Sequence, residues 1–509
     1  MLRANRRGFL QGSAALALGA LAPFGARAEA RRGGTLRIGT SFGSTSTTLD
    51  PVSFTDVYAY TLGFTMGNCL VELDHNKKPV PELAESWDSA DGAKRWVFRI
   101  RKGVEFHNGK TLTAADVAWS LNRHIAPGSK SAARGFLKGI SAIRADGDTL
   151  VVEHESGDAD IPVAMAQFHL VIVPEGYEFG RGFVGTGPYV LERFDPGVAF
   201  SATRNANYWK PDRAWLERVE ILNVLDATAR TTALMTGEVH GIDRVEPKVI
   251  DLLKGRGSFE ILQSVGTRYL TTVMDVRSAP FDDPHVRAAL KAAIDRERIR
   301  KTAFRGSGLV GNDHPVPPSD PFFNSDLPQR SYDPEKVRWH LRQAGHDRLR
   351  VDLHAADAAY AGSVDAAVLM QAAAEGTGLE INVVREPNDG YWSSVWMKKP
   401  YVMSNWAVRP TPTMMFSIAF ACGAPWAEAF WCNERFTKLL AESRTTTDFE
   451  RRKAMLWELQ AIVRDDGGNG IYHFPAETEA YAPAVKGLEP DTVAPLQGAR
   501  IAERAWMAD

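Results

Sequence analysis

Residues Lys102–Arg123 read KGVEFHNGKTLTAADVAWSLNR, and this stretch says more about the fold than any other part of the chain. Just before it, residues 96–101 alternate apolar and mostly polar side chains, the period-two pattern of a strand with one apolar face. His107–Lys110 predicts a turn. Thr113 is the expected N-cap of a helix, with Asp116 three residues later in a capping-box arrangement. The block therefore predicts a strand, a tight turn and a capped helix.

This block resembles a phrase shared by the extracytoplasmic solute receptors of the peptide/nickel ABC importers. Gly185–Tyr189 (GTGPY) is a second landmark of that family, and its glycines are expected to allow a sharp turn, because Pro188 and the missing GxGxxG spacing exclude a dinucleotide loop. The resemblance implies an α/β, two-lobed periplasmic-binding-protein fold (type II-like) with an extra α/β subdomain inserted in the first lobe. Further segments similar to the family are Pro79–Trp87, Arg204–Trp209, Thr231–Asp243, Pro280–Ile294 and Cys422–Leu440.

The length also favours more than one lobe. The chain has 509 residues, 44% of them hydrophobic, whereas single cores stop growing near roughly 250–300 residues. A chain that leaves the first lobe and returns to it creates connecting strands that act as a hinge. The expected division is a signal peptide over 1–28, lobe I over 29–75, 185–275 and 471–509, the inserted subdomain over 76–184, and lobe II over 276–470.

The N-terminal residues have the features of an export signal. Arg6 and Arg7 precede an apolar run over 13–24 and the small-residue site Ala26–Ala28, which together predict a twin-arginine signal cleaved after Ala28. The apolar run is shorter than the roughly 20 residues that span a bilayer, and no cysteine follows it to accept a lipid. The sequence thus predicts a soluble periplasmic protein.

Charge and cysteines narrow the function further. The formal net charge is −2, and removing residues 1–28 would make it more negative, so nucleic acid is not expected as a partner. In an oxidising compartment Cys422 and Cys432 are candidates for a disulfide, and Cys69 for a buried free thiol. A zinc site at Cys422 and Cys432 is disfavoured, because two thiolates without a nearby histidine are too few ligands. We expect no metal and no cofactor.

An enzyme remains an alternative, because twin-arginine export is often used for folded, cofactor-loaded proteins. The motifs HExxH, GxxxxGK[ST] and CxxC are all absent. The twelve histidines are scattered, and a lone histidine such as His107 is more often structural. The expectation is therefore a protein without enzymatic activity.

A receptor needs a cleft with apolar walls and a few convergent polar groups. A Ser/Thr-rich loop over 41–48 is a candidate wall, and so is the aromatic segment 391–431, although about half of its rings are expected in the core. The candidate ligand-binding residues are Ser44, Thr45, Tyr269, Tyr391, Trp392, Asn405, Trp406, Arg409, Thr411 and Trp426.

Arg409 is the most specific of these candidates. In peptide-binding members of the family, an aspartate three residues after a tryptophan meets the α-amino group of the ligand, and this chain has Arg409 at that spacing after Trp406. A guanidinium there would repel an ammonium group and bind a carboxylate or phosphate in bidentate fashion. An internal salt bridge to an acid of the other lobe is the alternative.

The resemblance implies a periplasmic receptor that captures a peptide or peptide-like solute between two lobes and delivers it to an ABC permease and ATPase in the inner membrane. Arg409 favours an anionic, opine-type ligand. Receptors for a sugar conjugate or a metal chelate are alternatives. By the same resemblance the protein is expected to be a monomer.

Overall fold

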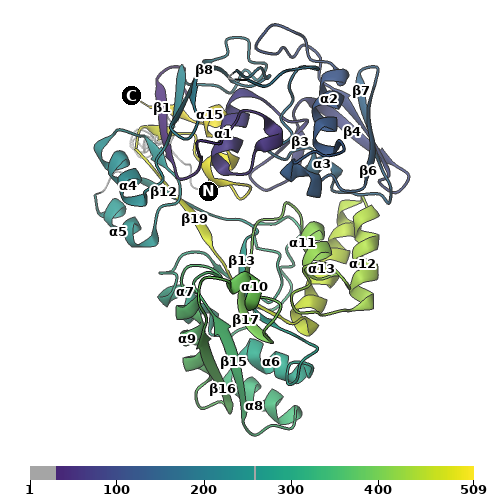
Figure 1. The fold of residues 1–509 in the computed structure, drawn as a ribbon, viewed down its shortest axis with the longest axis vertical. Helices are drawn as coiled ribbons and strands as arrows, with labels where there is room; N and C mark the ends of the chain where they lie inside the picture. The colour runs from purple at the N-terminus through teal and green to yellow at the C-terminus, as the bar shows by residue number, and fades with distance from the viewer. Residues whose placement is uncertain (1–29, 181, 257–258, 509) are drawn as a thin grey trace, which may run out of the picture.

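The computed structural model describes residues 30–180, 182–256 and 259–508, so the predicted signal peptide lies outside the described residues. Figure 1 shows two bodies, one above the other, each built on its own sheet. The upper body, lobe I, contains a mixed seven-stranded sheet in which β1 pairs in parallel with β10 and β11. In spatial order its strands are β12 (Glu260–Val265), β19 (Ala476–Tyr481), β11 (Gly241–Ile242), β1 (Thr35–Thr40), β10 (Arg218–Asn223), β9 (Ala199–Arg204) and β8 (Tyr189–Asp195).

The lower body, lobe II, is built on a six-stranded sheet that forms a core of its own with helices on its faces. Its strands are β14 (Leu309–Val310), β18 (Asn469–Phe474), β13 (Tyr269–Met274), β17 (Tyr401–Trp406), β15 (Leu349–Ala355) and β16 (Leu379–Arg385). Its helices are α6 (Pro284–Ala292), α7 (Arg296–Thr302), α8 (Pro334–Gln343), α9 (Ser363–Ala374), α10 (Tyr391–Ser394), α11 (Pro412–Ala419), α12 (Glu434–Thr445) and α13 (Phe449–Asp466).

The stretch that opened the sequence analysis folds within a subdomain beside lobe I. Strand β5 places Trp96, Phe98 and Ile100 in the core, and α2 begins after Thr113 with the expected capping box. Asp116 does more than cap, because it also accepts the Glu175 amide at 2.7 Å. The subdomain sheet orders β4 (Ala84–Ala90), β5 (Arg95–Ile100), β7 (Thr149–His154) and β6 (Ile140–Asp146), with α2 (Ala114–Ile125) and α3 (Ile161–Ala164).

The remaining elements complete lobe I. A short ribbon joins β2 (Val71–Leu73) to β3 (Pro79–Pro81), and a second joins β20 (Val485–Lys486) to β21 (Trp506–Met507). The helices are α1 (Val57–Met66), α4 (Ala227–Thr236), α5 (Pro247–Gly255), α14 (Pro495–Gly498) and α15 (Ile501–Arg504). None of the helices in the described ranges is both long and apolar enough to span a membrane.

Two expectations need correction. Strands β13 and β18 pair inside the lobe II sheet, so the crossings lie at 266–268 and Pro475 rather than at the predicted boundaries near 276 and 470. The reason is that one continuous β-stretch runs from β12 into β13, and only pairing reveals where it changes sheet. The chain does bend at 186–188, but Gly185 and Gly187 have no left-handed φ, and a Cβ at either would clash with Met66 in α1 or Gly67 just after it, so these glycines are needed for close packing rather than for a left-handed turn conformation.

Candidate functional site

Three cavities lie where the loops of lobe I and the subdomain face those of lobe II. The central cavity has a volume of about 390 Å³, the subdomain-side cavity about 850 Å³ and the hinge-side cavity about 400 Å³. The loop 407–411, between β17 and α11, contributes residues to all three. We call the three cavities together the cleft. Each volume falls within the range of small-molecule sites.

The central cavity has an aromatic wall on the lobe I side. Tyr60 of α1 stacks on Phe168 with ring centroids 4.4 Å apart. The Tyr60 hydroxyl lies 3.5 Å from Nε2 of His169, and burial lowers the pKa of that imidazole to about 4, so it is neutral at pH 7. Phe42 and Phe136 also line this cavity. The wall therefore offers flat apolar surface with one neutral imidazole.

Arg409 faces this wall from lobe II. Its backbone amide donates to Oγ1 of Thr267 at 3.1 Å, and that hydroxyl donates back to the Arg409 carbonyl at 2.8 Å. The guanidinium donates to the Val408 carbonyl at 2.9 Å and lies 5.9 Å from the ring of Trp406. Burial lowers its pKa, and among the described residues no carboxylate lies within ion-pair distance of it. The alternative of an internal salt bridge is thus not found for Arg409 among the described residues.

On the flank of the cleft beside the subdomain, side-chain ion pairs connect the subdomain to lobe II. Asp160 is buried and receives Nη2 of Arg452 at 2.6 Å and the hydroxyl of Thr411 at 2.7 Å. Burial alone would raise the pKa of Asp160, but Arg452 and the hydroxyls hold it below its usual value. Nearby, Arg444 pairs with Asp158 at 3.0 Å. The subdomain and helices α12 and α13 are therefore already in contact.

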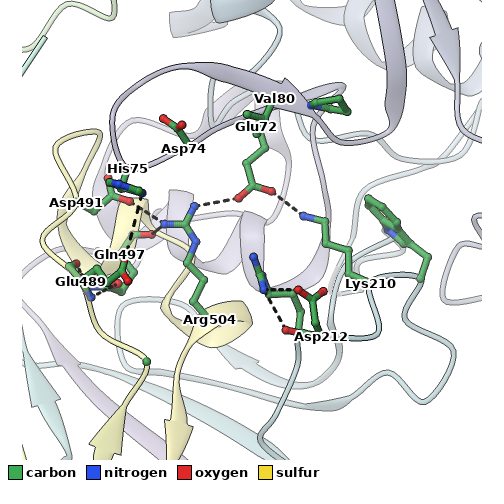
Figure 2. A pocket seen from close by; sticks show the side chains of 14 residues that line it. Glu72, Asp74, His75, Val80, Lys210, Asp212, Glu489, Asp491, Gln497 and Arg504 are labelled. Atoms are coloured by element: carbon green, nitrogen blue, oxygen red, sulfur yellow. Dashed lines mark hydrogen bonds and ion pairs between the residues drawn. The ribbon is translucent and has the colours of Figure 1, made fainter. Parts of the chain in front are cut away.

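A fourth cavity, of about 540 Å³, lies inside lobe I and is strongly charged (Figure 2). Lys210 contacts Glu72 at 2.7 Å, and Arg504 joins Glu72 to Asp491. Lys210 also contacts Glu503 at 2.8 Å. Deeper in, Arg500 binds Glu82 at 2.7 Å. We call the six residues the lobe I network: Glu72, Glu82, Lys210, Arg500, Glu503 and Arg504.

The lobe I network contains the one group of carboxylates in the described ranges with metal-ligand spacing, Glu72, Glu82 and Glu503. Their oxygens already accept from Lys210 and Arg500. Burial alone would lower the pKa of Lys210, but the surrounding carboxylates raise it well above its usual value. The network is therefore an internally neutralised structural unit, and we do not assign a ligand to it.

The structure separates the predicted site residues into two groups. Asn405 lines the hinge-side cavity, Arg409 the central cavity and Thr411 the subdomain-side cavity. The others are not among the residues that line the cleft: Ser44, Thr45, Tyr269, Tyr391, Trp392, Trp406 and Trp426.

Physical reasons explain why these predicted residues do not line the cleft. The Tyr391 hydroxyl donates to the Met403 carbonyl at 2.7 Å, and the Trp406 indole donates to Glu428 at 2.8 Å, so both are core residues. Tyr269 is fully buried beside Trp406. Trp392 and Trp426 lie on the surface, exposed by 42% and 43%.

The remaining sequence expectations concern the Ser/Thr loop and the cysteines. Ser44 and Thr45 are exposed, and Ser44 bonds to Ser46 within its own loop. Cys422 and Cys432 form a disulfide, while Cys69 is buried and donates to the Gln167 carbonyl at 3.3 Å.

Sequence reasoning missed the lobe I side of the cleft. Phe42 is two residues from the predicted Ser44, but Tyr60, Phe168 and His169 come from elements without a ligand-binding pattern. Lys77, at the junction of two cavities, was also missed. Only folding brings these residues together.

Comparison with known proteins identifies the family. Residues 78–428 match the model described as bacterial extracellular solute-binding proteins, family 5 Middle. Heme-binding protein A of Haemophilus influenzae is 29% identical over 311 residues, covering 55% of this chain and 56% of that protein. Glutathione-binding protein GsiB of Escherichia coli is 29% identical over 320 residues, covering 60% of each. The chain thus spans less than two thirds of the length of these curated relatives.

Solved structures show the same fold. HbpA2 from Haemophilus parasuis superposes with a TM-score of 0.84 at 20% identity, covering 94% of this chain and all of that one. AgaA of A. tumefaciens in complex with agropinic acid gives 0.70 at 23% identity, with 94% and 99% covered. The predicted two-lobed α/β fold is confirmed. With the family match over residues 78–428, the chain belongs to the bacterial extracellular solute-binding proteins of family 5.

Proposed function

We propose that this protein is the substrate-binding receptor of an ABC importer, and that it captures a peptide-like solute with a carboxylate in the cleft between its lobes. The solute passes to a membrane permease served by an ATPase. No covalent step is involved. Export through the twin-arginine signal at Arg6 and Arg7, a periplasmic location and a monomeric state belong to the same proposal.

The observation that carries the proposal is Arg409. Its guanidinium lines a cavity between the lobes and has no carboxylate partner among the described residues. A guanidinium is a planar, bidentate donor for carboxylates. The named ligands of the relatives support this chemistry, because glutathione, haem and agropinic acid all carry carboxylates.

Capture would proceed by lobe closure about the two crossings. The aromatic wall of Tyr60 and Phe168 belongs to lobe I, and Arg409 to lobe II, so a solute in the central cavity contacts both. A ligand that binds both lobes stabilises their closed arrangement by its differential affinity for it. Transport specificity then depends on which solutes reach the two walls together.

The test is titration calorimetry with glutathione, haemin and agropinic acid on the wild type and on Arg409→Gln. We expect at least one acid to bind, and Arg409→Gln to weaken it roughly 10- to 100-fold, since a hydrogen bond to a charged group contributes about 1.5–3 kcal/mol. Arg350→Gln is the matched control, because Arg350 is a solvent-exposed lobe II arginine that does not line the cleft. Equal affinity in Arg409→Gln removes the carboxylate role.

A second candidate is a planar ligand without a carboxylate, such as a sugar conjugate or a metal chelate. The stacked Tyr60 and Phe168 pair favours it, because aromatic faces bind flat apolar surfaces. Mass spectrometry of whatever co-purifies with the protein separates the two. A neutral conjugate recovered in stoichiometric amount would favour this candidate.

A further inference from the structure

Lys77 lies in the turn between β2 and β3, at the junction of the central and subdomain-side cavities. Its side chain is 8% exposed, and its Nζ has no hydrogen-bond partner in the described structure. An ammonium group removed from water without a partner costs several kcal/mol. A lysine in this state needs a reason.

The nearby acids do not explain why Lys77 is buried. Burial lowers the pKa of Lys77, and Asp320 and Asp491 oppose this shift from a distance. Asp491 is engaged by Arg504 at 2.8 Å, and Asp320 accepts the Phe322 amide at 3.0 Å. Neither carboxylate forms an ion pair with Lys77 within the described residues.

The backbone conformation does not explain the lysine at this position either. Lys77 has a φ of 63°, in the left-handed region, and its amide closes the turn on the Asp74 carbonyl at 2.9 Å. Holding a lysine there costs about 1–2 kcal/mol, which glycine would avoid. The turn therefore does not require a lysine, and both its backbone and its charge are held at a cost.

A second unpartnered atom lines the same cavity. Nδ1 of His169 is buried without a hydrogen-bond partner in the described structure. The imidazole is neutral, so it offers a ligand a hydrogen bond without adding charge. Lys77 and His169 belong to lobe I, and Arg409 faces them from lobe II.

We propose that Lys77 and Arg409 bind two carboxylates of one solute from opposite lobes, with His169 as a neutral hydrogen-bond partner. The ligand class is then a dicarboxylate rather than any peptide-like molecule. This inference rests on the proposed function and deepens it. It assigns a cation to each lobe, so that only a doubly acidic solute satisfies both lobes on closure.

The test uses Lys77→Met, with Lys94→Met as the matched control, because Lys94 is an exposed lysine of the subdomain and is not among the residues that line the cleft. The probes are glutathione and haemin, each compared with its dimethyl ester, by titration calorimetry. We expect Lys77→Met to weaken the affinity for at least one free acid roughly 10- to 100-fold and to leave the affinity for its diester unchanged. Lys94→Met should change either affinity less than 2-fold. Unchanged affinity for both acids in Lys77→Met overturns the inference.

Two further measurements keep the outcomes distinct. If neither acid binds the wild type, that result counts against the proposed function, and the melting temperature of the unliganded variants decides the role of Lys77. We expect Lys77→Met to melt higher than Lys94→Met, because it removes an unpaired buried charge. A lower melting temperature shows a structural lysine and overturns the inference. So does Asp320→Asn if it weakens acid binding as much as Lys77→Met, because Lys77 would then act through Asp320.

Discussion

The lobe I network and the central cavity both hold cationic side chains that are buried or half-buried, but they differ in how the charges are matched. In the network, Lys210 and Arg500 each contact more than one carboxylate. In the central cavity, Lys77 and Arg409 have no carboxylate partner within the described residues. Matched buried charges maintain the fold, whereas unmatched ones remain available to a ligand.

The largest effect is expected from Arg500→Met in the network. Arg500 contacts Glu82 at 2.7 Å and Glu503 at 2.9 Å, and its loss leaves buried carboxylates undercompensated. We expect the free energy of unfolding to fall by about 3–5 kcal/mol in urea denaturation. Arg350→Gln on the surface should change it by less than about 0.5 kcal/mol. An Arg500→Met protein as stable as the wild type would contradict the view that matched buried charges maintain the fold.

Asp160→Asn tests a matched pair at the cleft itself. The substitution leaves Arg452 buried without its carboxylate, although the hydroxyls of Thr411 and Thr413 can still bind an amide. We expect the free energy of unfolding to fall by about 2–4 kcal/mol, somewhat less than when a whole charged partner is removed. Arg435→Gln, in an exposed pair with Glu458 on the same two helices, is the control. An unchanged urea midpoint would contradict a role for this pair.

Glu479 is a buried acid without a cationic partner among the described residues, and its contribution to stability depends on pH. Burial raises the pKa of Glu479 to about 7, so the folded state keeps its proton while the unfolded state loses it near pH 4.5. Stability should therefore fall by about 2–3 kcal/mol between pH 4.5 and 7, because the folded state binds more protons there. Denaturation of Glu479→Gln across this range should show that much less dependence on pH. An identical pH profile in both proteins would contradict the prediction.

The smallest effect is expected from Ser44→Ala combined with Thr45→Ala. Both residues are exposed, and neither is among the residues that line the cleft. Ligand affinity by calorimetry should change by less than about 2-fold, within the usual range for surface substitutions. A large loss of affinity would place this loop in the binding site and extend the cleft to include it.

The sequence was sufficient for local structure and for the family. Thr113 and Asp116 form the predicted capping box because caps depend on residues three apart. The crossings were misplaced, since strand pairing between β13 and β18 joins residues about 200 positions apart.

The cleft was harder to predict for the same reason. Arg409 stood out through its spacing from Trp406, but the indoles of Trp396 and Trp406 donate to the buried Glu428 rather than facing the cleft. Lys77 and His169 became candidates only when the fold placed them on one cavity without partners. A sequence shows which side chains carry charge but not which charges go unmatched.

The hydrogen bonds between Thr267 and Arg409 have a mechanical consequence. Thr267 lies in the crossing between β12 and β13, so the ligand-facing loop is attached directly to the pivot. A solute held there acts on a short lever arm, and the far end of lobe II, around α8 and β16, sweeps a much longer arc for the same rotation (Figure 1). If the lobes close about the crossings as proposed, a small rotation near the guanidinium produces a larger displacement at the tip of lobe II.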